Sequence, residues 1–187
     1  MSRKNPLATK KEIFISHGKD PKPVEELKAI LADVGLKPVV LSEQPSGGRT
    51  IVEKLEQYSN VGFAFVILTP DDLGGVVEFG SVWSRPARLR RFLKNAHTRP
   101  RQNVVLEFGY FVGKLGRSRI ACLLKKPVEL PSDMQGIVYL RFNESIEEIR
   151  GEIVRELEAA GYEIVNDAPR KLRISEHSHR EEENGTD

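Results

Sequence analysis

A single acidic residue lies in an otherwise apolar stretch near the middle of the 187-residue chain. The stretch reads RQNVVLEFGYF from Arg101 to Phe111, and its only acid is Glu107. Its spacing predicts a helix over 102–115, on which Asn103 and Glu107 share one face because they are four residues apart. We expect this face to lie close to the helix N-terminus, whose positive partial charge favours the carboxylate form of Glu107.

The apolar pattern around Glu107 leaves two interpretations open. The acid is either a solvated position on an otherwise buried helix or a carboxylate that faces a cleft. Surface acids on amphipathic helices are common, so the pattern by itself favours the solvated position.

Apolar strands alternate with amphipathic helices between Glu12 and Val165. Such alternation predicts a parallel sheet with right-handed crossovers, and hence a flavodoxin-like, doubly wound α/β domain with five strands. The expected strands are 12–17, 38–41, 61–68, 119–124 and 137–142, and the expected helices are 23–34, 50–59, 102–115 and 145–160.

Helix ends carry recognisable signals in this sequence. Pro23 suits a first helical turn and Gly35 suits a helix stop, because proline needs no hydrogen-bonded N–H and glycine tolerates unusual backbone angles. Ser145 and Glu148 have the spacing of a capping box.

Polar residues follow the first predicted strand. Ser16, His17 and Gly18 offer a hydroxyl, an imidazole and a residue that lets backbone amides approach a phosphate or a ribose. Ligands of open α/β sheets bind outside the carboxyl ends of the strands, which is where these residues stand. An ordinary turn between strand and helix is the alternative.

Two further polar loops end predicted strands. After 61–68, Asp71 and Asp72 could bind Mg²⁺ or ribose hydroxyls, or could cap a turn. The loop 42–49 places Gly47 and Gly48 before a helix, but it lacks the spacing of known phosphate-binding motifs, which favours a flexible loop.

The net charge of +2 hides an uneven distribution. Residues 85–101 hold seven Lys or Arg and no acid, and Pro86 and Pro100 flank most of them. Because proline interrupts regular structure, we interpret 73–100 as a basic insertion or long loop.

The composition predicts one domain over 11–165, after an extension at 1–10. Residues 166–187 are polar, with Leu172 and Ile174 as their only large aliphatic side chains, and we expect a disordered tail.

Cys122 lies in an apolar run and is expected to be buried and inert. The sequence shows neither a membrane-spanning run nor a signal peptide, so we expect a cytoplasmic protein without a membrane partner.

The motif RQNVVLEFGYFVGKLGR, preceded by FAFVILTPDD and followed by RIACLLKKPVELPSDMQGIVYLRF, resembles bacterial TIR-like proteins over residues 11–162. That family includes the TIR domains fused to cyclic-nucleotide sensors in antiphage systems, and resembles the wider set of TIR enzymes that hydrolyse NAD⁺. The resemblance implies a TIR fold and an NAD⁺ glycohydrolase that releases nicotinamide and forms ADP-ribose or cyclic ADP-ribose.

The same resemblance implies roles for individual residues. Glu107 matches the catalytic glutamate of the family. The nucleotide pocket would be lined or supported by Ser16, His17, Gly18, Asp71, Arg101 and Asn103. The BB loop would span 42–49 and include Ser42, Gln44, Ser46, Gly47 and Arg49. NAD⁺ would be the substrate, with no cofactor and no metal.

The resemblance also implies self-assembly into a homo-oligomer on activation, with an upstream sensor protein or a cyclic-nucleotide signal. The sequence departs from the family in its basic segment and in having no recognisable fused sensor, which leaves the mode of activation open.

Three other functions are alternatives for this sequence. A non-catalytic TIR-like module that binds a nucleotide and signals by assembly is the first. A nucleic-acid contact through the basic segment is the second, but a solvated loop is favoured, and we expect no nucleic-acid partner. A receiver domain ranks last, because its acidic pair after the first strand is absent. His177 and His179 receive no role, since two histidines alone make a poor metal site.

Overall fold

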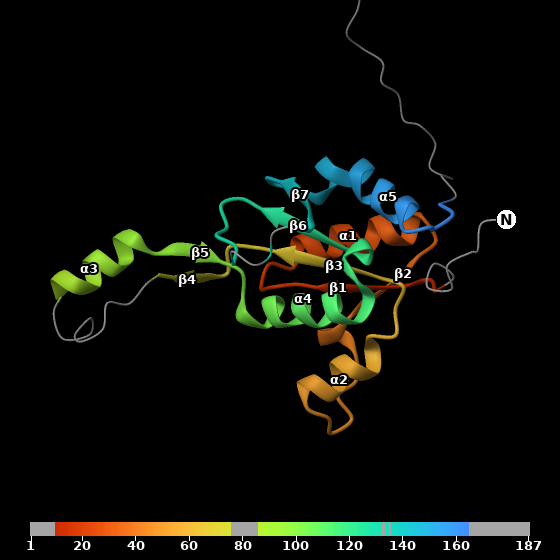
Figure 1. Ribbon diagram of the computed structural model, residues 1–187, viewed down its shortest axis with the longest axis horizontal. Helices are drawn as coiled ribbons and strands as arrows, with labels where there is room; N and C mark the ends of the chain where they lie inside the picture. The colour runs from red at the N-terminus through yellow and green to blue at the C-terminus, as the bar shows by residue number, and fades with distance from the viewer. Residues whose placement is uncertain (1–9, 76–85, 132–133, 135, 165–187) are drawn as a thin grey trace, which may run out of the picture.

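The computed structural model describes residues 10–75, 86–131, 134 and 136–164 of the chain. Five parallel strands form its central sheet in the order β2-β1-β3-β6-β7 (Figure 1). This order places β1 and β3 side by side in the middle, and it confirms the predicted flavodoxin-like, doubly wound α/β architecture.

The five strands of the sheet fall where the sequence predicts them, within two residues at each end. They are β1 (Glu12–Ser16), β2 (Lys37–Val40), β3 (Phe63–Leu68), β6 (Ile120–Lys125) and β7 (Val138–Phe142). All six residues of β3 are buried, as expected for a parallel strand covered on both faces.

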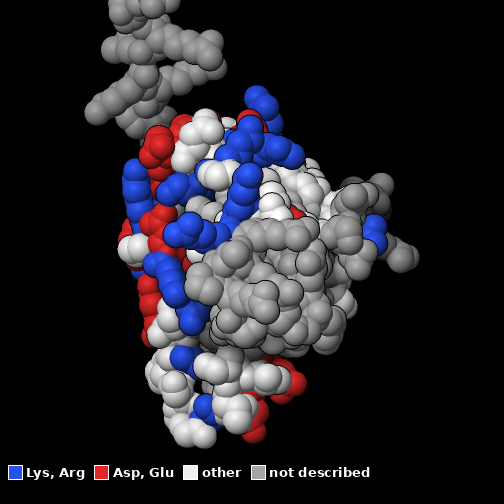
Figure 2. Space-filling view, turned by 90° about the vertical axis from the view of Figure 1, so that its left-hand side faces the viewer, with Lys and Arg blue, Asp and Glu red and all other residues white. Residues whose placement is uncertain are grey.

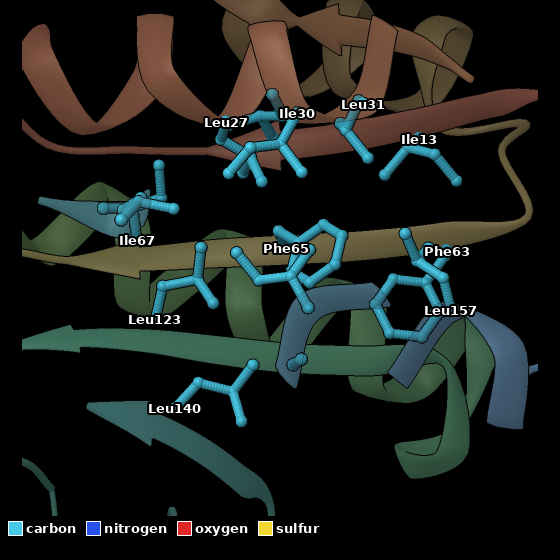
Figure 3. Packing of buried hydrophobic residues seen from close by; sticks show 14 of the residues in the cluster. Ile13, Leu27, Ile30, Leu31, Phe63, Phe65, Ile67, Leu123, Leu140 and Leu157 are labelled. Atoms are coloured by element: carbon cyan, nitrogen blue, oxygen red, sulfur yellow. The ribbon is translucent and has the colours of Figure 1, made fainter. Parts of the chain in front are cut away.

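One face of the sheet is covered by α1 (Lys22–Asp33) and α5 (Arg150–Ala159). Figure 3 shows Leu27, Ile30 and Leu31 of α1 packing toward Phe65 of β3. Leu157 of α5 joins the same cluster. Pro23 lies in the first turn of α1, and Gly35 follows the helix with φ +73°, as the sequence predicts.

The opposite face is covered by α2 (Ile51–Tyr58) and α4 (Gln102–Leu115). Val104, Phe108 and Phe111 form the buried stripe of α4, at intervals of three and four residues. The Phe111 ring lies 4.4 Å from the ring of Phe14 in β1, between centroids. This packing fixes the rotation of α4 about its own axis, and with it the direction in which Glu107 points.

The prediction of a long loop over 73–100 is wrong, because this basic segment contains strands and a helix. Residues 72–99 begin and end in a two-stranded antiparallel sheet of β4 (Asp72–Gly74) and β5 (His97–Arg99), and α3 (Pro86–Asn95) precedes β5. We call β4, α3 and β5 the arm, because they extend away from the central sheet (Figure 1). Pro86 starts the helix instead of interrupting it, since a first helical residue needs no N–H donor.

The arm carries exposed basic residues. Arg90 and Lys94 of α3 are both exposed, as is Leu93 between them. Figure 2 faces the end of the molecule at which α3 lies, and shows several Lys and Arg side chains on this side, with Asp and Glu side chains along the left edge and at the lower right.

Two smaller differences concern element ends. Leu41, predicted in a strand, begins the short 3₁₀ helix η1 (Leu41–Glu43). The last predicted helix begins with a 3₁₀ turn, η5 (Ile146–Ile149), before α5. The capping box of Ser145 and Glu148 is present at the start of that turn. A second capping box, of Thr50 and Glu53, starts α2.

The predicted extension 1–10, apart from Lys10, and the predicted tail 166–187 lie outside the described residues. Among the residues that are described, no helix has both the length and the apolar character needed to cross a bilayer.

Cys122 gives a direct check on the central sheet. Its side chain is fully buried in β6, and burial raises the pKa of the thiol to about 12. Because the thiolate is the reactive form, we expect no reaction with a thiol reagent such as DTNB in the native protein, and complete reaction in denaturant. Stoichiometric labelling without denaturant would contradict the packing of β6.

Candidate functional site

Glu107 and Ser16 meet at the carboxyl end of the central sheet. The Ser16 hydroxyl donates a hydrogen bond of 2.5 Å to Oε2 of Glu107. Ser16 is the last residue of β1 and is buried, whereas Glu107 is partly exposed. The carboxylate therefore lies at the edge of the core, on the side of the sheet at which α/β folds bind ligands.

The position of Glu107 follows from the amphipathic pattern of α4. Its neighbour Phe108 is buried, and Leu106 on the other side is 63% exposed. Glu107 lies between the buried side of α4 and its exposed side, at the boundary of the buried stripe. Of the two interpretations open from the sequence, the pattern alone favours the solvated position, whereas the structure has the carboxylate only partly exposed.

The expected electrostatic effect on Glu107 is also wrong. Burial raises the pKa of Glu107 above its ordinary value, and this effect exceeds the opposing effects of the Ser16 hydrogen bond and of nearby His17. Gln102 is the first residue of α4, which places Glu107 beyond the first turn. A helix dipole acts mainly within the first turn, so desolvation decides the direction of the shift.

His17 connects the first loop to the loop after β2. Its Nδ1 lies 2.8 Å from the carbonyl oxygen of Gly18. A carbonyl only accepts, so Nδ1 carries a hydrogen, and in the neutral ring Nε2 is the acceptor. The Ser42 hydroxyl lies 3.4 Å from that Nε2. The loop after β1 and the loop after β2 therefore both contact the imidazole of His17.

Asp71 lies against the first loop from the end of β3. Its Oδ1 accepts a hydrogen bond of 3.1 Å from the backbone N–H of Lys19, and its Oδ2 accepts one of 2.9 Å from the Thr69 hydroxyl. Both carboxylate oxygens thus bond to the protein. Sequence analysis did not assign a site role to Lys19 or Thr69, although Thr69 is buried and two residues from Asp71.

The remaining predicted residues are more exposed. Arg101 caps α4 without a side-chain hydrogen bond, and Asn103 is exposed one turn before Glu107. In the predicted BB loop, Gly47 and Gly48 have φ of +55° and +75°, and the Gln44 side chain donates to the carbonyl of Val40. Ser46 accepts a hydrogen bond from the backbone N–H of Arg49 through its carbonyl.

A cavity of about 620 Å³ lies beside α4, but none of the predicted site residues lines it. Gln102 and Val105 contribute to its wall from α4. They lie on a different side of the helix from Asn103 and Glu107, because only residues three or four apart share a face. The other lining residues are Arg99, Pro100, Glu129, Leu130 and Pro131.

The described residues contain no cluster of three or more His, Cys, Asp or Glu side chains placed to hold a metal ion. Asp71 and Asp72 were the sequence candidates for Mg²⁺. The carboxylate of Asp71 is bonded to Lys19 and Thr69 as described above.

Comparisons with known proteins agree on one family. The sequence model of the TIR domain of CAP12/Pycsar effector proteins matches residues 12–144. The chain is 41% identical to YuaY of Escherichia coli K12 over 135 residues, which are 72% of this chain and 40% of that protein. It is 34% identical to protein tirC of Dictyostelium discoideum over 149 residues, which are 76% of this chain and 69% of that protein.

A third relative carries the family name. The chain is 35% identical to the Pycsar effector protein PaPycTIR of Pseudomonas aeruginosa over 89 residues, which are 46% of this chain and 24% of that protein. The aligned part thus covers less than half the length of YuaY and of PaPycTIR.

The burial of Glu107 predicts a stability effect that depends on pH. A carboxyl with a raised pKa in the folded state stabilises the fold below its unfolded pKa, and this contribution is lost as pH rises through the folded pKa. Glu107→Gln does not titrate. We therefore expect its unfolding temperature, relative to the wild type, to rise as pH increases from about 4 to 7.

Thermal unfolding at a series of pH values measures this difference. Glu158→Gln is the control, because Glu158 is also a helical glutamate but is exposed on α5. An equal response of the two variants to pH would contradict the burial of Glu107.

Proposed function

The chain belongs to the family of CAP12/Pycsar effector TIR domains, and on that premise we propose that it is an NAD⁺ glycohydrolase. It cleaves the bond between nicotinamide and ribose and forms ADP-ribose, or cyclic ADP-ribose when the adenine closes the ring. We place this activity in bacterial antiphage defence, because the chain belongs to the CAP12/Pycsar effector TIR family and is similar to the Pycsar effector protein PaPycTIR.

The observation that carries the proposal is the position of the Glu107 carboxylate. It is partly buried, held by Ser16, and located at the ligand-binding edge of a doubly wound sheet. Burial keeps water from screening the charge, so the carboxylate acts more strongly on a nearby positive charge than it would in bulk solvent.

The reaction needs such a charge. Nicotinamide is cationic in NAD⁺ and leaves as a neutral molecule, so its departure moves positive charge onto the ribose. The Glu107 carboxylate stabilises this oxocarbenium-like centre and orients the ribose hydroxyls, as carboxylates do in glycosidases. Water then adds to C1′ of the ribose and releases one proton.

The other site residues receive supporting roles. Ser16 fixes the carboxylate of Glu107, and His17 and Gly18 contact the nucleotide beside it. Arg101 and Asn103 are exposed near the N-terminus of α4, where they contact the nucleotide. The loop 42–49 borders the nucleotide site through the contact of Ser42 with His17.

Activity requires assembly of several copies, in response to an upstream sensor or a cyclic-nucleotide signal. Ile51 and Val52, at the start of α2 and separated from the BB loop by Thr50, are 63% and 55% exposed. Two adjacent exposed aliphatic side chains of this kind offer a contact surface for a second copy.

Nicotinamide release from NAD⁺ tests the enzymatic function. We expect turnover by concentrated wild-type protein, and a loss of at least about 100-fold in kcat for Glu107→Ala and Glu107→Gln. Glu158→Gln should retain wild-type activity. In the wild type, kcat/KM should fall with decreasing pH at an inflection above the ordinary range of a glutamate, because burial raises the pKa of the required carboxylate.

Two results would contradict this function. One is nicotinamide release at equal rates by wild type and Glu107→Gln. The other is the absence of release at every protein concentration, and NAD⁺ binding without turnover would then favour the non-catalytic module.

The dependence on assembly has its own test. We expect the rate per molecule to rise with protein concentration in the wild type, and the Ile51→Ser/Val52→Ser variant to need at least about tenfold more protein to reach the same rate. Val138→Ser, at the 39% exposed Val138 of edge strand β7, is the control. A rate per molecule that does not change with concentration would rule out activation by self-assembly.

A further inference from the structure

Asp71 and Gly18 form an unusually close contact between two loops of the site. A Cβ atom placed on Gly18 would lie 1.7 Å from Oδ2 of Asp71, 2.6 Å from its Cγ and 2.8 Å from Oγ1 of Thr69. Gly18 does not have a left-handed backbone conformation. Glycine is therefore required at this position because a larger side chain would clash with Asp71, and not because the backbone conformation demands it.

The carboxylate of Asp71 uses both oxygens inside the protein. One accepts from the backbone N–H of Lys19, directly after Gly18, and the other accepts from Thr69. The backbone N–H of Asp71 is shared between the carbonyl oxygens of Thr69, at 2.9 Å, and Arg99, at 3.2 Å. Asp71 is thus fixed at its backbone and at its side chain.

This contact controls the start of the first loop. Ser16 ends β1, where it is in register with Val66 of β3. Two residues later, Gly18 contacts the side chain of Asp71. The loop after β1 is therefore held by the sheet at Ser16 and by the Asp71 carboxylate at Gly18. Between these two points lie the Ser16 hydroxyl, which bonds to Glu107, and the His17 ring, which bonds to Gly18.

We propose that Asp71 is a positioning residue: its carboxylate fills the space left by Gly18, holds Lys19, and so sets the placement of Ser16 and His17 against Glu107. This assignment rests on the proposed function, and it replaces a direct role of Asp71 in binding the substrate.

Two variants of Asp71 separate geometry from charge. Asp71→Asn and Asp71→Ala both remove the negative charge. The asparagine oxygen can still accept from Lys19 N–H, and its amide can donate to the Thr69 hydroxyl, whereas alanine can do neither. Any difference between the two variants therefore reports the hydrogen bonds.

The pKa of Glu107 is the first readout. Release of the loop weakens the Ser16 hydrogen bond, which otherwise lowers that pKa. We expect the pKa of Glu107, followed by carboxyl carbon-13 NMR and assigned with Glu107→Gln, to rise by about half a unit or more in Asp71→Ala relative to Asp71→Asn. Asp72→Asn is the matched control, because no side-chain hydrogen bond or ion pair of Asp72 is found among the described residues.

A double-mutant cycle is the second readout. Gly18→Ala should lower the urea midpoint of unfolding in the wild type, because the new methyl group meets the carboxylate of Asp71. The same substitution should cost clearly less in the Asp71→Ala background, where that carboxylate is gone. Equal costs in both backgrounds would contradict the contact.

Turnover provides the third readout. We expect Asp71→Ala to lower kcat by about tenfold to 100-fold with KM changed less than about twofold, and Asp71→Asn to recover much of the loss. A raised KM with an unchanged Glu107 pKa would identify Asp71 as a substrate ligand and overturn the proposal. The first two readouts need no turnover, so a failure of the proposed NAD⁺ hydrolysis is distinguishable from a failure of this assignment.

Discussion

The partial burial of one carboxylate is the constraint on which the site depends. Removing a charged group from water is costly unless hydrogen bonds replace its solvation. Ser16 supplies such a bond to Glu107, yet the pKa of Glu107 remains raised, so the bond compensates only part of the cost. The fold thus holds Glu107 in a place where its ionised form is less stable than it would be in water. Such a placement is typical of functional sites and unusual for a surface helix.

Several well-packed elements are needed to keep Glu107 in that position. The buried stripe of α4 fixes the helix against the sheet, and Phe111 contacts Phe14 of β1. Ser16 follows Phe14 by two residues on the same strand, so strand β1 holds both the packing contact and the hydrogen-bond donor. A shift of one residue in the register of β1 would turn Ser16 to the other face of the sheet.

Much of this architecture could be predicted from the sequence, because the spacing of apolar residues and the residues that cap helices are local signals. The apolar run of β3 and the span of α4 show this, as does the partnership of Ser145 with Glu148. The failures at the site have a common cause, which is that they depend on distant residues. The raised pKa of Glu107 comes from atoms packed around it, and the contact of Asp71 with Gly18 joins residues 53 positions apart. The sequence indicated that Asp71 and Asp72 could cap a turn, but not that Asp71 contacts Gly18.

The arm explains how a long insertion can interrupt the chain next to the site without disturbing it. Its strands pair at the base, where Asp72 is in register with Arg99. The Arg99 carbonyl accepts from the N–H of Asp71, and the Arg99 side chain bonds to Glu129 at 2.6 Å. Asp71, three residues after the end of β3, and Arg99, three residues before α4, are therefore joined whatever sequence lies farther out, so Glu107 keeps its position relative to Ser16.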